Sequence, residues 1–328
     1  MSDASTIFDD LVGNERAKNI LERAFLHCTL SHAYLFAGPK SIGKFTVASK
    51  LAQALLGVSN LTLHPDFRFV HREHDEKTGK MQRDISVEQI RELISWASGS
   101  AQAATNIKIA IIDEAERLNV AAANAILKTL EEPSGNAHFF LIAADEEILP
   151  TTIRSRCQLV RFTNARDAEM EALAETLGLA KDDAAKLLPL SAQSPGRLVR
   201  LATDAEYQAR QIREAQRFME LKTLPLHARF QAVSDFWDAD GDHMESRDRL
   251  GEVLGLWMLM TRKSLAMGEA KSTFLIGEHV DFVSPIAKQD GHLLPFLKLL
   301  TESRLDLRHN VHPKFIINQL LIAMSYEN

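Results

Sequence analysis

The 328-residue sequence contains only two cysteines, Cys28 and Cys157, which are too few for a disulfide framework or a thiolate-rich zinc site. No apolar run approaches the ~20 residues that a membrane helix requires, and the first residues lack the basic and apolar regions of a secretory signal. Positive charge is also scarce, because 38 Lys and Arg stand against 44 Asp and Glu, for a net charge of −6. A protein whose whole surface grips nucleic acid is normally basic. We therefore expect a reduced, cytoplasmic protein without membrane contact, whose contacts with DNA are local or shared with partner chains.

A glycine-rich segment nearly matches the phosphate-binding P-loop pattern and reads GPKSIGKFT. The two glycines and the lysine of the pattern are present as Gly38, Gly43 and Lys44. The next position should supply a hydroxyl for Mg²⁺ but holds Phe45, and Thr46 lies one residue late, about 100° further around a helix. We predict a loop that can cradle phosphate but lacks the usual metal ligand, with ATP or ADP and Mg²⁺ as its candidate ligands.

Short apolar runs alternate with helical patterns in the first half of the chain. The strand-sized runs cover residues 33–37, 107–112, 137–143 and 159–162, and the helical patterns cover 14–30, 47–55, 86–96 and 120–130. Ser86 and Gln89 stand at the two positions of a capping box at the start of one helix. Alternation of this kind is typical of a parallel sheet with crossover helices.

Strand patterns disappear after residue 163, and from about residue 208 the pattern is helical throughout. We therefore expect three parts. Residues 1–163 would form an α/β P-loop domain with a parallel sheet, residues 164–207 a small helical lid, and residues 208–328 an all-α domain.

Asp113 and Glu114 directly follow the apolar run at 107–112. Carboxylates at the carboxyl edge of a parallel sheet can hold Mg²⁺ and polarise an attacking water. The same two residues could instead favour the start of the next helix electrostatically. We favour a catalytic role, or descent from one, because a P-loop candidate precedes them.

Arg156 lies in a Ser-Arg-Cys segment just before the last strand-sized run. An arginine at the edge of such a domain can reach the γ-phosphate held by an adjacent subunit, where it contributes a factor of about 10³–10⁵ to the rate. Its guanidinium keeps its proton and forks onto phosphate oxygens. The simpler interpretation is a surface salt bridge.

Several segments together resemble bacterial clamp-loader subunits, which belong to the AAA+ superfamily. The resemblance is close over residues 5–205, and the helical remainder is compatible with it. It is carried by the segments SHAYLF (31–36), HPD (64–66), ISVEQIR (85–91), DE (113–114), NAILKTLEEP (124–133), LP (149–150), SRC (155–157) and SPGR (194–197).

The resemblance implies roles for individual residues. Arg156 would be an arginine finger presented in trans to the ATP of a neighbouring gamma/tau subunit. Arg197 would match the sensor-2 arginine, which reads nucleotide from the lid. The degenerate nucleotide site would consist of Gly38, Gly43, Lys44, Thr46, Asp113, Glu114 and Arg197.

The resemblance also implies partners. The C-terminal helices would pack in a collar with those of gamma/tau and delta subunits, and the assembly would load a sliding clamp onto primed DNA. This chain would act as a stator within the DNA polymerase III holoenzyme, a nucleotidyltransferase assembly, with little or no ATPase activity of its own.

Two departures from the family pattern concern chemistry. The sensor-1 position near Ala144 and Asp145 lacks the polar Thr or Asn of active members, which adds to Phe45 in arguing against ATP turnover. Many relatives carry a four-cysteine zinc module where this chain has residues 57–63 without a cysteine. The nearby histidines lack thiolate partners and a ligand spacing, so we expect no metal site.

Two alternatives remain at this stage. An active gamma/tau-like ATPase would need Ser or Thr at position 45, where the chain has Phe45. A DNA-binding regulator built on an inactive AAA+ scaffold is the second alternative, and the acidic charge balance counts against it.

Overall fold

The computed structural model describes residues 7–75, 79, 81–133, 135–233, 243–267, 274–275, 281–282, 290–308 and 311–324. The chain forms two compact units. The first comprises Met1–Leu173 with Gln193–Arg197, and the second comprises Ala174–Ala192 with Leu198–Asn328. The division falls inside two helices, α6 (Asp167–Thr176) and α8 (Pro195–Thr203). The three-part division expected from the sequence stays a prediction.

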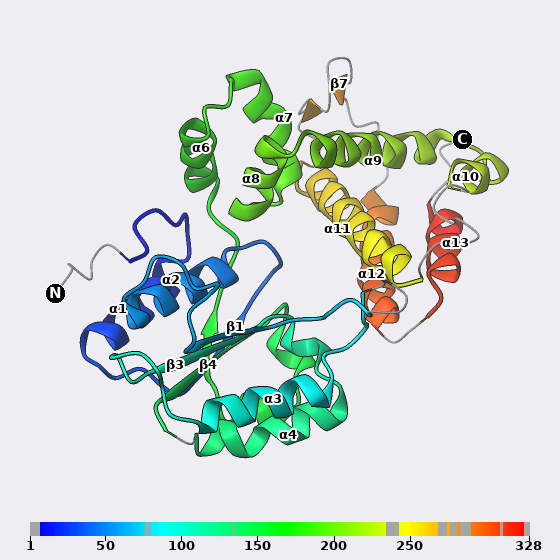
Figure 1. Cartoon of the computed structure of the whole chain (residues 1–328). Helices are drawn as coiled ribbons and strands as arrows, with labels where there is room; N and C mark the ends of the chain where they lie inside the picture. Colours follow the sequence, from blue (N-terminus) through cyan, green and yellow to red (C-terminus); the bar gives the residue numbers. More distant parts are fainter. Residues whose placement is uncertain are drawn as a thin grey trace. The chain divides into compact units, whose positions relative to one another are not determined.

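The first unit is built on a sheet that lies between two layers of helices (Figure 1). The sheet has five strands in the order β2-β3-β4-β1-β5, and every neighbouring pair is parallel. This confirms the predicted parallel α/β fold. The strands are β1 (Ala33–Ala37), β2 (Phe67–Val70), β3 (Lys108–Ile112), β4 (Ala137–Ala143) and β5 (Gln158–Arg161), and the helices are α1 (Glu15–Leu26), α2 (Lys44–Leu56), α3 (Val87–Ser98), α4 (Val120–Glu131) and α5 (Thr151–Arg154).

Helices α1 and α2 cover one face of the sheet, and α3 and α4 cover the other (Figure 1). Along β1 the buried side chains alternate between the two cores: Leu35 packs on the α3/α4 side, whereas Tyr34 and Phe36 pack on the α1/α2 side. Phe36 lies within ring contact of Phe140 (centroids 5.7 Å apart) and Phe162 (5.6 Å). Because both faces are buried, the central strands read as continuous apolar runs.

Strand β2 was missed by the sequence analysis. It lies at the edge of the sheet, and only Val70 is buried, while Arg68 and Phe69 are exposed. An edge strand that is mostly solvated lacks the continuous apolar run that identified the other strands.

The ends of two helices follow local sequence signals. Ser86 and Gln89 form the predicted capping box, since the Ser86 Oγ accepts from the Gln89 N–H and the Gln89 Oε1 accepts from the Ser86 N–H. Helix α4 begins after Asn119, whose side chain accepts from the Ala122 N–H at 2.8 Å. It ends at Glu131, before the proline at 133.

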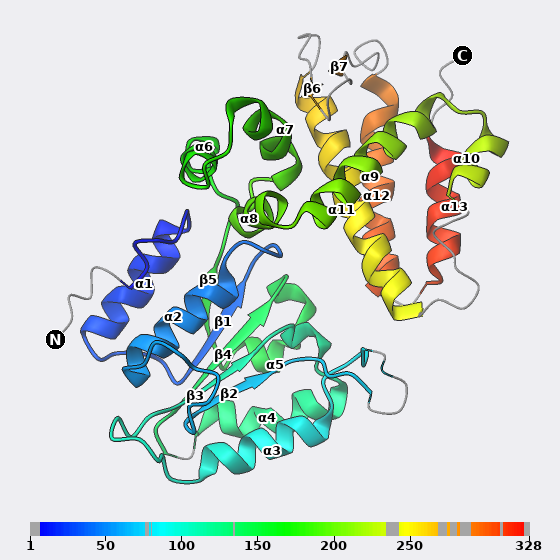
Figure 2. The same ribbon diagram turned by 45° about the horizontal axis from the view of Figure 1, so that its top comes forward.

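The second unit is mainly helical, as predicted (Figure 2). Its further elements are α7 (Lys181–Ser191), α9 (Ala205–Thr223), α10 (Leu226–Ala232), α11 (His243–Met267), α12 (Asp290–Arg308), α13 (Pro313–Ala323) and two short antiparallel strands, β6 (Phe274–Leu275) and β7 (Asp281–Phe282), which the sequence analysis did not predict. Phe218, Trp257 and Phe296 form part of its core. Among the described residues, no helix has both the length and the apolarity needed to cross a membrane.

Candidate functional site

The P-loop follows β1 and leads into α2, as its sequence pattern requires. Gly38 has φ +153°, and a Cβ at this position would lie 2.3 Å from the Phe162 carbonyl oxygen on the neighbouring chain segment. Gly43, at the start of α2, has φ +101° but faces open space. The first glycine is therefore required by backbone packing, and the second by its backbone conformation.

The tip of the loop is held by the segment that begins α8. Ser41 is in the left-handed region with φ +59°. Its carbonyl oxygen accepts from the Ser194 Oγ at 2.6 Å and from the Gly196 N–H at 2.9 Å. These bonds attach the Ser-Pro-Gly-Arg segment to the loop and place the half-buried Arg197 directly after the attachment point.

Lys44 is buried and turned toward its own loop. Its Nζ donates to the carbonyl oxygens of Gly38 (2.5 Å) and Pro39 (2.6 Å). Burial lowers the pKa of the Lys44 ammonium to about 8, although the negative charges of Glu116 and Asp113 raise it. The ammonium that would bind a phosphate is therefore engaged with backbone carbonyls.

Phe45 stands where a metal-binding hydroxyl was expected, and its side chain is 43% exposed. Its ring contacts Phe69 on β2 (centroids 5.1 Å apart), and Phe69 in turn contacts His71 (4.8 Å). Thr46 is exposed on the next position of the helix. The donor set around the loop thus lacks the hydroxyl that would hold Mg²⁺ and does not fit a metal–nucleotide complex of the usual kind.

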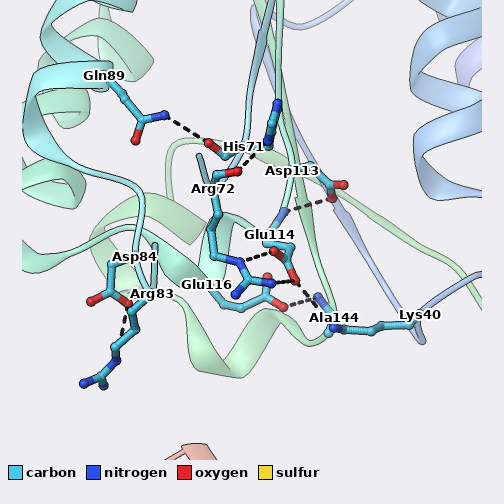
Figure 3. Close-up of polar contacts among 10 residues, drawn as sticks. All are labelled: Lys40, His71, Arg72, Arg83, Asp84, Gln89, Asp113, Glu114, Glu116 and Ala144. Carbon is cyan, nitrogen blue, oxygen red and sulfur yellow. Dashed lines mark hydrogen bonds and ion pairs between the residues drawn. The ribbon is translucent and has the colours of Figure 1, made fainter. Parts of the chain in front are cut away.

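Asp113 and Glu114 lie at the carboxyl end of β3, as predicted (Figure 3). Burial raises the pKa of Asp113, whose Oδ1 accepts from the Glu114 N–H at 2.8 Å. Glu114 stands at the N-cap position of a short 3₁₀ helix (Ala115–Arg117) without a side-chain capping bond, and Asn119 caps α4, so both interpretations of the two carboxylates stay predictions.

Glu114 is bound to Arg72, a residue just after β2 that sequence reasoning missed (Figure 3). The Arg72 Nε donates to Oε2 at 2.6 Å and the Arg72 Nη2 donates to Oε1 at 3.3 Å, while the exposed Lys40 lies 3.5 Å from Oε1. Burial raises the pKa of Glu114. The Arg72 hydrogen bonds and the positive charges of Lys40, Arg72 and Arg117 outweigh this effect, so the net pKa lies below its usual value. The carboxylate is therefore ionised but occupied.

Glu116 is a second residue that the sequence did not reveal. Its Oε1 accepts from the Ala144 N–H at 3.3 Å, which ties the turn after β3 to the end of β4 (Figure 3). Its charge is also the largest one acting on the pKa of Lys44. The signal in the sequence that could have identified Glu116 was its position two residues after Glu114.

We call Gly38, Gly43, Lys44, Asp113 and Glu114 the P-loop site. The fold brings these residues to the carboxyl ends of β1 and β3, and Lys44 and Asp113 are close enough to interact electrostatically. The two glycines of the phosphate loop are present, and Phe45 stands in place of the metal-binding hydroxyl. Lys44 and Glu114 both have partners within the chain.

Arg156 lies between α5 and β5, in what we call the Arg156 corner (Thr152, Ser155, Arg156 and Glu131). Its Nε and Nη2 both donate to the Glu131 Oε2, at 3.1 and 3.0 Å. Its Nη1 donates to the Thr152 carbonyl at 3.0 Å and more weakly to the Ser155 Oγ at 3.4 Å. The Arg156 side chain is 29% exposed and that of Glu131 is 58% exposed, so this is a surface ion pair.

Among the described residues, no group of three or more His, Cys, Asp and Glu side chains could hold a metal ion. Cys157, which directly follows Arg156 in the chain, is a poor nucleophile, because burial raises the pKa of its thiol to about 12.

Comparison with known proteins supports the resemblance seen in the sequence. Residues 13–166 match the family described as DNA polymerase III, delta subunit. The Pseudomonas aeruginosa DNA polymerase III subunit delta′ is 35% identical over 184 residues, which cover 50% of this chain and 54% of the relative. The Bacillus subtilis subunit tau is 33% identical over 172 residues, covering 47% of this chain and 29% of the relative.

A gamma subunit-related protein of DNA polymerase III from Thermotoga maritima is similar in structure, with a TM-score of 0.49 and 18% identity, over 93% of this chain and 98% of the other. The chain thus spans about half or less of the curated relatives it matches.

Proposed function

We propose that this chain, whose residues 13–166 match the family described as DNA polymerase III, delta subunit, is a delta′-like stator of the clamp-loader family in the AAA+ superfamily. In this role it supplies Arg156 to the ATP site of a neighbouring gamma/tau-like subunit. The neighbour hydrolyses ATP, and the assembly loads a sliding clamp onto primed DNA in the cytoplasm.

The single observation that carries the proposal is the state of the P-loop site. Phe45 replaces the metal-binding hydroxyl, and Glu114 is paired with Arg72. A hydrolytic site needs a bound metal ion and a free carboxylate to orient water. A chain with this P-loop site is better suited to assist ATP hydrolysis by a neighbouring subunit than to hydrolyse ATP itself.

The position of Arg156 agrees with a role in trans. Its guanidinium is partly exposed, and within the described part of the chain it is held by a surface ion pair and by groups of its own turn. Exposed ion pairs of this kind contribute about 0–1 kcal/mol, so an incoming phosphate can displace Glu131 at little cost.

The proposed partners are gamma/tau-like and delta-like subunits. Exposed apolar side chains on two helices of the second unit support a collar contact with such partners. They are Leu294 and Leu305 on α12 and Phe315 and Ile322 on α13. As part of the same proposal, residues 1–163, 164–207 and 208–328 act as the AAA+, lid and collar parts.

The test is Arg156→Ala in a reconstituted clamp loader. Hydrolysis at the neighbouring ATP site should fall by about 10³, with the complex still assembled, because one transition-state charge partner is lost. Arg161→Ala is the matched control, since Arg161 is also an exposed arginine paired with a glutamate, Glu146. Unchanged single-turnover hydrolysis with Arg156→Ala would refute the proposal.

A second candidate, an active gamma/tau-like ATPase, is favoured by one observation: Lys44, Asp113 and Glu114 still converge at one edge of the sheet. Turnover by the isolated chain separates the two. Robust hydrolysis that Lys44→Ala abolishes would establish the motor and exclude the stator.

A further inference from the structure

The Arg156 corner contains a competitor for the phosphate that Arg156 would bind. A guanidinium has five N–H donors, and its fork onto phosphate oxygens uses two of them side by side. In this chain Nε and Nη2, one such pair, both point at a single oxygen of Glu131. The Nη1 group is directed at the Thr152 carbonyl and the Ser155 hydroxyl.

Both partners of this ion pair lie next to residues of the same buried core. Glu131 is the last residue of α4 and follows Leu130, which is fully buried in the core beneath α3 and α4. Arg156 follows the short helix α5, whose Ile153 is fully buried in the same core. A change of side-chain rotamer at Arg156 or Glu131 is therefore enough to open the pair, with Leu130 and Ile153 still packed in the core.

We propose that Glu131 is a positioning residue that holds Arg156 in a withdrawn state until a neighbouring subunit's nucleotide displaces it. This inference rests on the proposed function, because it concerns the availability of the same arginine. The carboxylate occupies the forked edge of the guanidinium and neutralises its charge. Arg156 contributes to hydrolysis only from the fraction of molecules in which the pair is open.

The size of the effect follows from the exposure of the pair. Since solvent screens both groups, an ion pair of this kind shifts such an equilibrium by about two- to fivefold. Glu131 thus tunes the finger without blocking it.

The first experiment uses the isolated full-length chain. The rate at which an arginine-specific dicarbonyl reagent modifies Arg156 is followed by mass spectrometry in Glu131→Gln and in the matched control Glu132→Gln. Glu132 is the adjacent exposed glutamate, and its backbone N–H bonds to the Lys128 carbonyl. We expect a two- to fivefold faster modification only with Glu131→Gln. Equal rates in the two variants would overturn the proposal.

The second experiment uses the reconstituted complex. Glu131→Gln should raise the kcat of hydrolysis at the neighbouring site by about two- to fivefold with KM unchanged, and Glu131→Asp, which keeps the charge, should stay near the parent value. A fall in kcat with Glu131→Gln would overturn the proposal, since it would mean that Glu131 supports the active position. If Arg156→Ala leaves hydrolysis unchanged, the proposed function fails, while the reactivity of Arg156 in the isolated chain still decides its pairing with Glu131.

Discussion

The P-loop site and the Arg156 corner both contain charged side chains with partners in their own chain, but the two regions differ in the burial of those side chains. In the P-loop site Lys44 is 7% exposed and Arg72, which binds Glu114, is 8% exposed. In the Arg156 corner both charges reach solvent. Interactions between buried charges are strong and costly to break, whereas exposed pairs exchange readily. The comparison shows that a buried charged group keeps its partner within the fold, whereas an exposed charged group can exchange its partner for a group of another molecule.

The largest effect should come from the backbone frame of the P-loop. Gly38→Ala should destabilise the chain by about 3 kcal/mol or more, because its Cβ would clash with the Phe162 carbonyl and strain a positive φ. Gly43→Ala, which has the strain without the clash, should cost only about 1 kcal/mol. Urea denaturation of the two variants measures the difference. Similar losses in both would show that the loop does not depend on close packing against the end of β5.

The next test compares two arginine–glutamate pairs directly. Arg72→Met leaves a half-buried Glu114 without its main partner and should destabilise the fold by about 2 kcal/mol at pH 7, whereas Arg156→Met should cost less than about 1 kcal/mol. Because the folded-state pKa of Glu114 is lowered, the stability from its ion pair is present above pH ~4.5 and is lost as pH falls through the lowered value. The cost of Arg72→Met should therefore shrink in acid. Equal costs for both variants at pH 7 would break the comparison.

The smallest effect concerns the titration of Lys44. Its folded-state pKa of about 8 lies below the ordinary value of 10.5, so the unfolded chain binds the proton more tightly. Stability from this group should therefore rise between about pH 8 and pH 10.5 and be flat below that range. Lys44→Met should remove this rise, which amounts to about 1 kcal/mol between pH 8 and pH 9 and is seen as the difference between the two denaturation curves. Parallel pH profiles for the parent and Lys44→Met would mean that Lys44 is not held in a dry environment.

Much of the fold was predictable because its signals are local. The P-loop glycines, the Asp113–Glu114 strand end and the Ser86 capping box each depend on residues a few positions apart. The edge strand β2 was not predictable, since most of it faces solvent and carries no apolar run. Arg72 was missed for the same reason, because it follows that edge strand. It contacts Glu114 at the end of the neighbouring strand β3, and this contact is not visible in the sequence.

The roles of the candidate residues divide in the same way. Sequence identified Phe45 at the metal position, but not that its ring packs on Phe69 or that Lys44 turns back onto its loop. It offered a surface salt bridge as the simpler interpretation of Arg156, and the partner, Glu131, lies 25 residues earlier in the chain. The trans role of Arg156 stays a prediction.

The amino-acid order by itself determined most of the helices and buried strands and most of the chemical groups at the edge of the sheet, because periodicity, capping and turn residues act over short distances. Only the tertiary structure decided which charge meets which: Arg72 with Glu114, Lys44 with its loop, and Arg156 with Glu131. The physical reason is that an ion pair depends on distance and burial in space, and both are set when separate segments pack into one core.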